Sequence, residues 1–505
     1  MGVIIRQSIK GTIVNYVGIA IGFITTFFVL TRCLTAEEIG LTRVLVDAAT
    51  LFAGLAQLGT NASVMRFYPY FKDKKSKDHG FFFWSLVVPF IGFTIYSIIF
   101  LSLKVPISTA FAKNSQLFVD YYYFVFPLAF FMLYMAVFET NSNVLMRIAV
   151  PKFIREVGIR VMLLVVYLLY AYDVLSITGF IFSFSIVYGI ATLFNILYLF
   201  SLKRISYKPD FKFITKPLRK DYLNYTLFLI AAALGSAIAP SINTLFVTAK
   251  MGLVYTGVFT IATYVATVVE IPYRSLGTIS QPQISQAVKD NDIVTVNKLC
   301  KGVSLHQFLA GFFIFFIVWI NIDLFFDLLP NGQEYASAKW VVFILGMTRL
   351  FNSSFSVGTS VLSYSKYYYT SLGFSFLLTF LAIFFNVKLI PVWGINGAAF
   401  ATLFSYIIYY LLLLGLVKWK MKTSPFSMGQ FKVVLIICLL FALNWLWMTL
   451  LTPVLHSIPF SEFVCNIIDA VLRTSIFSII GIVIIYYWRV SDEVNVLIKK
   501  VLRKL

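Results

Sequence analysis

Ionisable side chains inside otherwise apolar runs are the residues of this sequence that could do chemistry. An ionisable group inside an apolar span is costly, so we treat it as a functional candidate. Glu270 and Arg274 are spaced i,i+4 and would share one face of a helix, with Pro272 between them as a potential kink. Arg349 lies about halfway along another apolar run. The forked donors of a guanidinium suit it to binding phosphate, so Arg274 and Arg349 are the main candidates for an anion-binding site.

Each of these positions also has a purely structural interpretation. Glu270 and Arg274 could neutralise each other across one helical turn. Arg349 could form an ion pair with a carboxylate such as Glu139 or Glu270. The sequence leaves both interpretations open.

Further polar candidates lie in the second apolar run and near the C-terminus. Asp47 is a candidate gating or coupling carboxylate, and Asn61 and Arg66 are candidates for contact with a substrate in a cavity. Arg66 could instead extend its side chain to the lipid head groups. Asp469 and Arg473 are spaced i,i+4, so they either pair locally or face a groove for a lipid tail.

A third group of polar residues is expected to lie toward the cytoplasmic side. Glu139 is followed by Asn141 and Asn143, and the next run contains Arg155 and Arg160. These side chains could form an inward gate. An ion pair between neighbouring helices is an equally good interpretation.

Metal and nucleotide chemistry have little support in the sequence. The cysteines and histidines are isolated, and a structural zinc site needs four convergent ligands. Asp290-Asn-Asp292 resembles a metal-binding D-x-D motif, but it lies in a short basic loop. No G-x-x-x-x-G-K-[ST] run for binding a nucleotide is present. We therefore expect no cofactor and no bound metal.

Composition places these residues in a membrane. The chain is 60% hydrophobic and only 12% charged, whereas soluble domains contain about 25% charged residues. Its formal net charge of +20 would suggest nucleic acid as the partner of a soluble protein. Here the basic residues lie between apolar runs, where they orient the chain and contact anionic lipids, so we expect no nucleic-acid partner.

About fourteen apolar runs are long enough to span a bilayer, which predicts an all-α integral membrane protein. Alternate loops are rich in Lys and Arg, and the intervening loops contain few. Because basic loops stay inside, both termini are expected in the bacterial cytoplasm. The expected spans lie near 8–33, 43–68, 80–103, 118–145, 153–172, 176–202, 222–248, 253–280, 302–329, 337–363, 367–390, 393–417, 430–451 and 464–488.

The spans divide into two halves with weak internal similarity. The turn Leu34-Thr-Ala-Glu-Glu-Ile-Gly40 follows the first span, and Val247-Thr-Ala-Lys-Met-Gly252 follows the seventh. A six-helix period of this kind is typical of transporters. We expect an N-terminal lobe (1–202), a cytoplasmic linker (203–221), a C-terminal lobe (222–417), and two further helices with a basic tail (418–505).

Several motifs together give the sequence a family resemblance. They are Gln7-Ser-Ile-Lys-Gly-Thr12, Leu34-Thr-Ala-Glu-Glu-Ile-Gly40, Leu329-Pro-Asn-Gly-Gln-Glu-Tyr-Ala336 and Leu389-Ile-Pro-Val-Trp-Gly-Ile-Asn-Gly-Ala-Ala-Phe-Ala-Thr402. The chain resembles the polysaccharide-exporting branch of the multidrug/oligosaccharidyl-lipid/polysaccharide (MOP) superfamily, and most closely the Wzx-type O-antigen flippases.

The resemblance implies a fold and a substrate. Two six-helix lobes would form a V, with the last two spans added outside. An undecaprenyl-pyrophosphate-linked oligosaccharide would cross from the cytoplasmic to the periplasmic leaflet of the inner membrane by alternating access. The pyrophosphate explains why cations are expected in the cavity, and span eight of a related lipid II flippase also supplies an arginine there. Membrane lipids, a polysaccharide polymerase and chain-length machinery are the implied partners.

Two other functions remain as alternatives. A cation-coupled drug exporter of the same superfamily often uses an aspartate in the first span, where this chain has Asn15 as its main deep polar side chain. A polytopic glycan polymerase or ligase would need a long outward loop, and all loops expected here are short. The sequence therefore favours a flippase over an enzyme.

Overall fold

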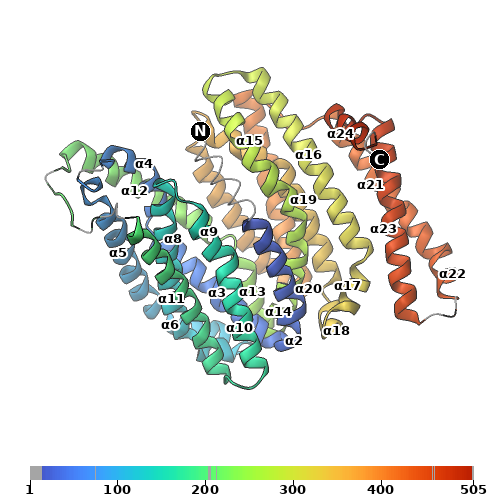
Figure 1. Cartoon of the computed structure of the whole chain (residues 1–505), viewed down its shortest axis with the longest axis horizontal. Helices are drawn as coiled ribbons and strands as arrows, with labels where there is room; N and C mark the ends of the chain where they lie inside the picture. Colours follow the sequence, from blue (N-terminus) through green and yellow to red (C-terminus); the bar gives the residue numbers. More distant parts are fainter. Residues whose placement is uncertain are drawn as a thin grey trace. The chain divides into compact units, whose positions relative to one another are not determined.

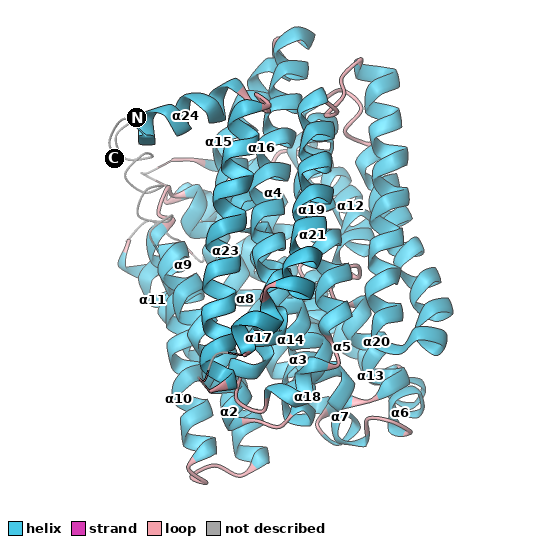
Figure 2. Cartoon of the chain, turned by 90° about the vertical axis from the view of Figure 1, so that its right-hand side faces the viewer, coloured by secondary structure: helices cyan, strands magenta, loops and turns pink. Residues whose placement is uncertain are grey.

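The computed structural model describes residues 14–73, 76–202, 206, 208–211, 213–457, 459 and 461–502. In this part of the chain, all regular secondary structure is helical, with short connections and no strand (Figure 2). The motif at 7–12 lies outside the described residues, as do Lys203, Arg204 and Lys212 of the expected linker.

The apolar runs form long helices, which confirms a polytopic all-α membrane protein. Within the described ranges, eleven helices are long and apolar enough to cross a membrane, judged by length and composition. One of them, α20 (Thr370–Met421), covers two expected spans and contains a kink at Gly394, where φ is 56°. Two other expected spans are interrupted. The span 153–172 consists of α9 (Ala149–Phe153), η4 (Ile154–Gly158) and α10 (Ile159–Ala171). The span 222–248 consists of α12 (Lys216–Ala237) and α13 (Ile242–Met251). The count of about fourteen spans remains a prediction.

The chain divides into two units, which we describe separately. Unit 1 contains residues 1–261, 329–331 and 375–398, and unit 2 contains residues 262–328, 332–374 and 399–505. The lobe and linker boundaries expected from the sequence remain a prediction.

Unit 1 is built around α3 (Ala36–Ala56), which packs on α5 (Phe81–Ser102) and α8 (Val125–Val144), while α11 (Ile177–Ser201) packs on α8 (Figure 1). A capping box starts α3, because the Thr35 side chain accepts from the Glu38 amide and the Glu38 carboxylate accepts from the Thr35 amide. Phe52 of α3 packs edge-on against Phe100 of α5 and against Phe126 of α8. Aromatic packing therefore fixes the helices that carry Asp47 and Glu139.

The beginning of α3 crosses the beginning of α14 (Leu253–Thr267) within unit 1. A Cβ on Gly40 would overlap the Leu253 carbonyl oxygen, and a Cβ on Gly257 would overlap the Ala36 carbonyl oxygen. Small residues allow such a close backbone approach between membrane helices. The crossing joins the helices that follow the two similar turns noted in the sequence.

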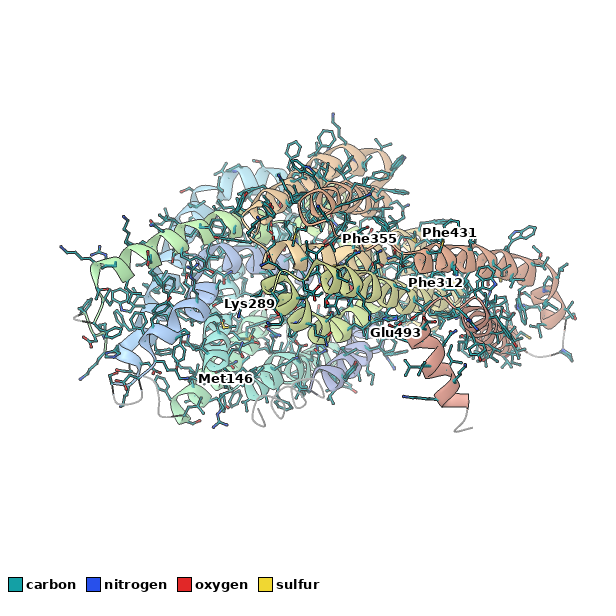
Figure 3. All side chains as sticks on the ribbon, turned by 90° about the horizontal axis from the view of Figure 1, so that it is seen from above. Met146, Lys289, Phe312, Phe355, Phe431 and Glu493 are labelled. Atoms are coloured by element: carbon teal, nitrogen blue, oxygen red, sulfur yellow. The ribbon has the colours of Figure 1, made fainter. Side chains whose placement is uncertain are left out.

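Unit 2 has its core on α16 (Ile293–Ile320). This helix packs against α19 (Lys339–Tyr364), α21 (Met428–Leu450) and α23 (Glu462–Tyr487). Phe312, only 1% exposed, lies among closely packed side chains (Figure 3). The expected runs 430–451 and 464–488 are confirmed as α21 and α23.

A buried ion pair within α23 is hydrogen-bonded to α21. Asp469 and Arg473 are 4% and 7% exposed, and Asp469 Oδ2 lies 3.5 Å from Arg473 Nη2. Trp447 Nε1 donates to Asp469 Oδ1 at 2.7 Å, and the Thr452 hydroxyl donates to the same oxygen at 3.2 Å. The local pairing expected from the i,i+4 spacing is thus confirmed.

Replacing Asp469 by Ala is expected to destabilise the protein by about 3–5 kcal/mol, because the Arg473 charge would remain buried without its partner. Replacing both residues by Leu should recover most of that loss. Thermal unfolding of the purified protein in detergent measures both effects. Asp290→Ala is the control, since Asp290 is exposed and accepts from Gln286 of its own helix, so its loss should change stability by below about 0.5 kcal/mol. Equal losses for Asp469→Ala and Asp290→Ala would contradict the prediction.

Candidate functional site

The candidate site in unit 2 is centred on the carboxylate of Glu270. A 3-10 turn, η5 (Val268–Glu270), leads into α15 (Ile271–Lys289), with Pro272 in the first turn of the helix. Proline is tolerated there because the first amides of a helix have no intrahelical acceptor. Figure 1 shows α15 beside α16 and α19, which it contacts. The break in helix geometry places Glu270 against α19, where it is 7% exposed.

Two side chains of α19 donate to Glu270. Arg349 Nη1 lies 3.2 Å from Glu270 Oε1, and Asn352 Nδ2 donates to the same oxygen at 3.1 Å. The Tyr410 hydroxyl donates to Asn352 Oδ1 at 2.7 Å, which fixes the orientation of the amide. A chain of hydrogen bonds thus runs from α20 through α19 to the end of η5.

Arg349 keeps donors available beyond this ion pair. Its side chain is 29% exposed, whereas the Glu270 side chain is 10% exposed. A guanidinium has five N–H donors, and Glu270 uses only part of this capacity. The carboxylate therefore holds Arg349 in place while the remaining donors can bind an anion.

Arg274 is exposed, and it forms no ion pair with any described residue. The pairing of Glu270 with Arg274 that the spacing allowed is not formed, because the carboxylate is directed to Arg349 instead. The i,i+3 spacing of Arg349 and Asn352 could have indicated that they share a face. Nothing in the sequence could have identified Tyr410, because tyrosines occur throughout the apolar runs.

In unit 1, Asp47 is buried and paired within its own helix. Arg43 Nε donates to Asp47 Oδ2 at 2.8 Å, and the Thr244 side chain also hydrogen-bonds to the carboxylate. The sequence reasoning missed Arg43, although its i,i+4 spacing from Asp47 was a usable signal.

An ion-pair network joins α8 to the π-helical turn η4 and to α10. Arg155 lies 2.9 Å from Glu139 and 3.3 Å from Glu156, and Arg160 lies 3.3 Å from Glu156. Arg160 also donates to the Gly18 carbonyl oxygen. The interhelical ion pair considered from the sequence is present, with Glu156 as a member that the sequence analysis overlooked.

The last two candidates lie on α4 (Thr60–Phe71). The Arg66 guanidinium lies 4.1 Å from the centroid of the Tyr225 ring, a cation–π contact. The buried Oδ1 of Asn61 accepts no hydrogen bond from the described residues. Asn61 and Arg66 belong to unit 1, whereas Glu270 and Arg349 belong to unit 2.

The described residues contain no group of three or more His, Cys, Asp or Glu side chains that could hold a metal ion. The arrangement around Glu270 instead provides an oriented cation for electrostatic binding of an anion.

Residues 5–288 match the family described as "Polysaccharide biosynthesis protein". No curated protein matches the sequence.

Solved structures of membrane transporters share the fold. Lipid II flippase MurJ in an inward closed conformation has a TM-score of 0.65 at 15% identity, covering 94% of this chain and 98% of MurJ. An inward-facing multidrug resistance MATE family transporter of the MOP superfamily has a TM-score of 0.59 at 15% identity, covering 81% and 96%. A MOP superfamily transporter from Pyrococcus furiosus has a TM-score of 0.52 at 16% identity, covering 84% and 96%.

Proposed function

The chain belongs to the polysaccharide biosynthesis protein family, and from this premise we propose that it is a flippase for a lipid-linked oligosaccharide. Its substrate is an undecaprenyl-pyrophosphate-linked repeat unit, which it moves from the cytoplasmic to the periplasmic leaflet of the bacterial inner membrane by alternating access. The fold shared with MOP superfamily transporters agrees with this proposal.

The pairing of Arg349 with Glu270 is the observation that carries the proposal. Glu270 accepts hydrogen bonds from Asn352 and Arg349, which fixes the position of the arginine. The half-buried Arg349 has further N–H donors that can bind a diphosphate. Arg274, exposed on the adjoining helix of the same unit, is a second cation for the same anion. A substrate with two linked phosphates explains why a membrane-embedded site would retain more positive than negative charge.

The paired groups of unit 1 provide gates in this proposal. Asp47 and Glu139 are each held by an arginine, so their ion pairs can break and reform as the protein alternates between states. Arg160 connects the ion-pair network of Glu139 to the span Val14–Cys33, because it donates to the Gly18 carbonyl oxygen. Asn61 and Arg66 contribute polar contacts to the sugars or phosphates. Membrane lipids surround the protein, and a polymerase with its chain-length machinery receives the product.

Substituting Gly40 by Val is expected to open the crossing of α3 and α14, since the added side chain would overlap the Leu253 backbone. Cys33 lies three residues before α3 and provides a native probe. In a Cys438→Ser background, which removes an exposed thiol, labelling of Cys33 by a membrane-impermeant maleimide should rise severalfold and glycan export should fall.

The control for this experiment is Gly415→Val, because a Cβ on Gly415 would meet no atom within 4 Å. It should leave both labelling and export unchanged. Normal export and unchanged Cys33 labelling in Gly40→Val would show that export does not depend on the close crossing of α3 and α14.

Deleting the gene tests the proposed function directly. We expect loss of surface polysaccharide and accumulation of lipid-linked repeat units on the cytoplasmic side, both reversed by the wild-type gene. If single repeat units still reach the surface unpolymerised, the protein acts after export as a polymerase. If surface glycan is intact and the cells become sensitive to cationic drugs, the protein is a drug exporter.

A further inference from the structure

A large apolar cavity lies within unit 1, and none of the site groups assigned above belongs to its lining. Its volume is about 540 Å³, within the range of about 300–1,000 Å³ that is typical of ligand sites. Its walls come from α3, α5, α6 (Lys104–Ala112) and α13, and Figure 1 shows α6 continuing from the end of α5. Lys250 is the only charged residue of the lining described.

The inner wall of the cavity is rigid, and its rim is open. Phe52, Phe111 and Phe118 are buried, and the Phe111 and Phe118 rings lie 4.9 Å apart. At the rim, the side chains of Ile99 and Leu103 are 44% and 46% exposed. A hydrocarbon chain could therefore enter past Ile99 and Leu103 and lie against a fixed aromatic wall.

Three lysines gather around this cavity. Lys250 lines it, Lys104 begins the helix α6 that forms one wall, and Lys113 directly follows that helix. The side chain of Asn114, next to Lys113, donates to the Lys250 carbonyl oxygen at 3.0 Å, so these two lysines are close in space. They are three of the few basic residues in the loops expected to be poor in Lys and Arg.

The lysines outnumber the nearby carboxylates. Asp47 precedes the lining residue Ala48, but its carboxylate is paired with Arg43. Asp120 lies at the end of α7 (Gln116–Asp120), and its Oδ1 accepts a hydrogen bond from Gln116. Lys104 donates to the Tyr123 hydroxyl at 2.6 Å. Lys250 is exposed and has no carboxylate within ion-pair distance among the described residues. An apolar cavity with an available cation at its edge matches a lipid that has a negative head group.

We propose that this cavity binds one acyl chain of an anionic phospholipid, whose phosphate is held by Lys250. The lipid is a bound component of the protein, distinct from the transported substrate. The volume fits a single acyl chain and is too small for the much longer chain of a polyprenyl carrier. Burial of the methylenes of the acyl chain provides affinity, and the lysine provides selection of the head group.

Two variants separate the contributions of the chain and the head group. Ala110→Trp would fill the cavity from α6, and Lys250→Gln would remove the charge. Val105→Trp is the matched control, because Val105 is on the same helix, is 71% exposed and does not line the cavity.

Native mass spectrometry of the full-length protein in detergent, titrated with phosphatidylglycerol or phosphatidylcholine, measures binding. The wild type and Val105→Trp should bind one tightly held phosphatidylglycerol in preference to phosphatidylcholine. Lys250→Gln should lose about fivefold in affinity for phosphatidylglycerol and with it the preference. Ala110→Trp should lose binding of both lipids.

Three outcomes would overturn the proposal. They are an unchanged head-group preference in Lys250→Gln, equal binding by Ala110→Trp and Val105→Trp, and displacement of phosphatidylglycerol by undecaprenyl phosphate at matched concentration. The last outcome would assign the cavity to the carrier lipid. A matched melting temperature for Ala110→Trp and the wild type would show that the variant is folded. Because no readout depends on export, a failure here leaves the proposed flippase function untouched.

Discussion

Substituting Arg349 by Met is expected to lower both protein abundance and glycan export, and the double variant Glu270→Gln/Arg349→Met is expected to restore abundance alone. The single variant leaves the Glu270 carboxylate nearly buried without its cation. Because Arg349 is partly exposed, we expect a loss of about 2 kcal/mol, below the usual range for fully buried pairs. In the double variant no charge remains, and Asn352 can still hydrogen-bond to the neutral amide of Gln.

Export separates a structural ion pair from a binding residue. An arginine that contacts the diphosphate contributes about 1.5–3 kcal/mol through charge-assisted hydrogen bonds, so export by the double variant should stay at least about tenfold below the wild type. Surface glycan per unit of membrane protein, compared by quantitative immunoblotting, is the measurement. If export returns together with abundance, the pair is structural and Arg349 does not bind the substrate.

Sequence periodicity and apolar length predicted most of the fold. The last two apolar runs match α21 and α23 because each is long, predominantly apolar and bounded by polar residues. The run 153–172 did not form one α-helix, because η4 interrupts it at a segment where Arg155 pairs with Glu139 and Glu156 pairs with Arg160. Apolar content therefore reports the length of a span, but it does not report where the helix changes geometry.

The site was harder to predict because its contacts join distant segments. Spacing placed Glu270 and Arg274 on one face, whereas Glu139 and Glu270 were both open as partners of Arg349. The structure confirms Glu270, 79 positions away in sequence. The same limitation hid Tyr410, which reaches Asn352 across 58 positions. Local pairs such as Arg43–Asp47 and Asp469–Arg473 follow from i,i+4 spacing, because both partners are fixed by one helix. Which cation remains available to a ligand depends on tertiary pairing, and in unit 2 that pairing leaves Arg274 exposed.

Arg274→Ala is therefore expected to reduce export without reducing stability. The side chain is exposed and forms no ion pair with the described residues, so its removal leaves no buried charge behind. If Arg274 binds the diphosphate, export should fall at least about tenfold while abundance and melting temperature stay at wild-type values. Arg274→Lys should retain part of the activity, since it keeps the charge and loses the forked geometry.

Lys289→Ala is the matched control for this prediction, because Lys289 is an exposed cation at the end of the same helix (Figure 3). It should not change export. Equal export by Arg274→Ala and the wild type would remove Arg274 from the site and leave Arg349 as its cation. Equal loss in Arg274→Ala and Lys289→Ala would indicate a general effect of positive charge on α15. Loss in Arg274→Ala alone, with partial recovery in Arg274→Lys, requires a specific anion at this position, because neither helix stability nor net charge distinguishes it from the control.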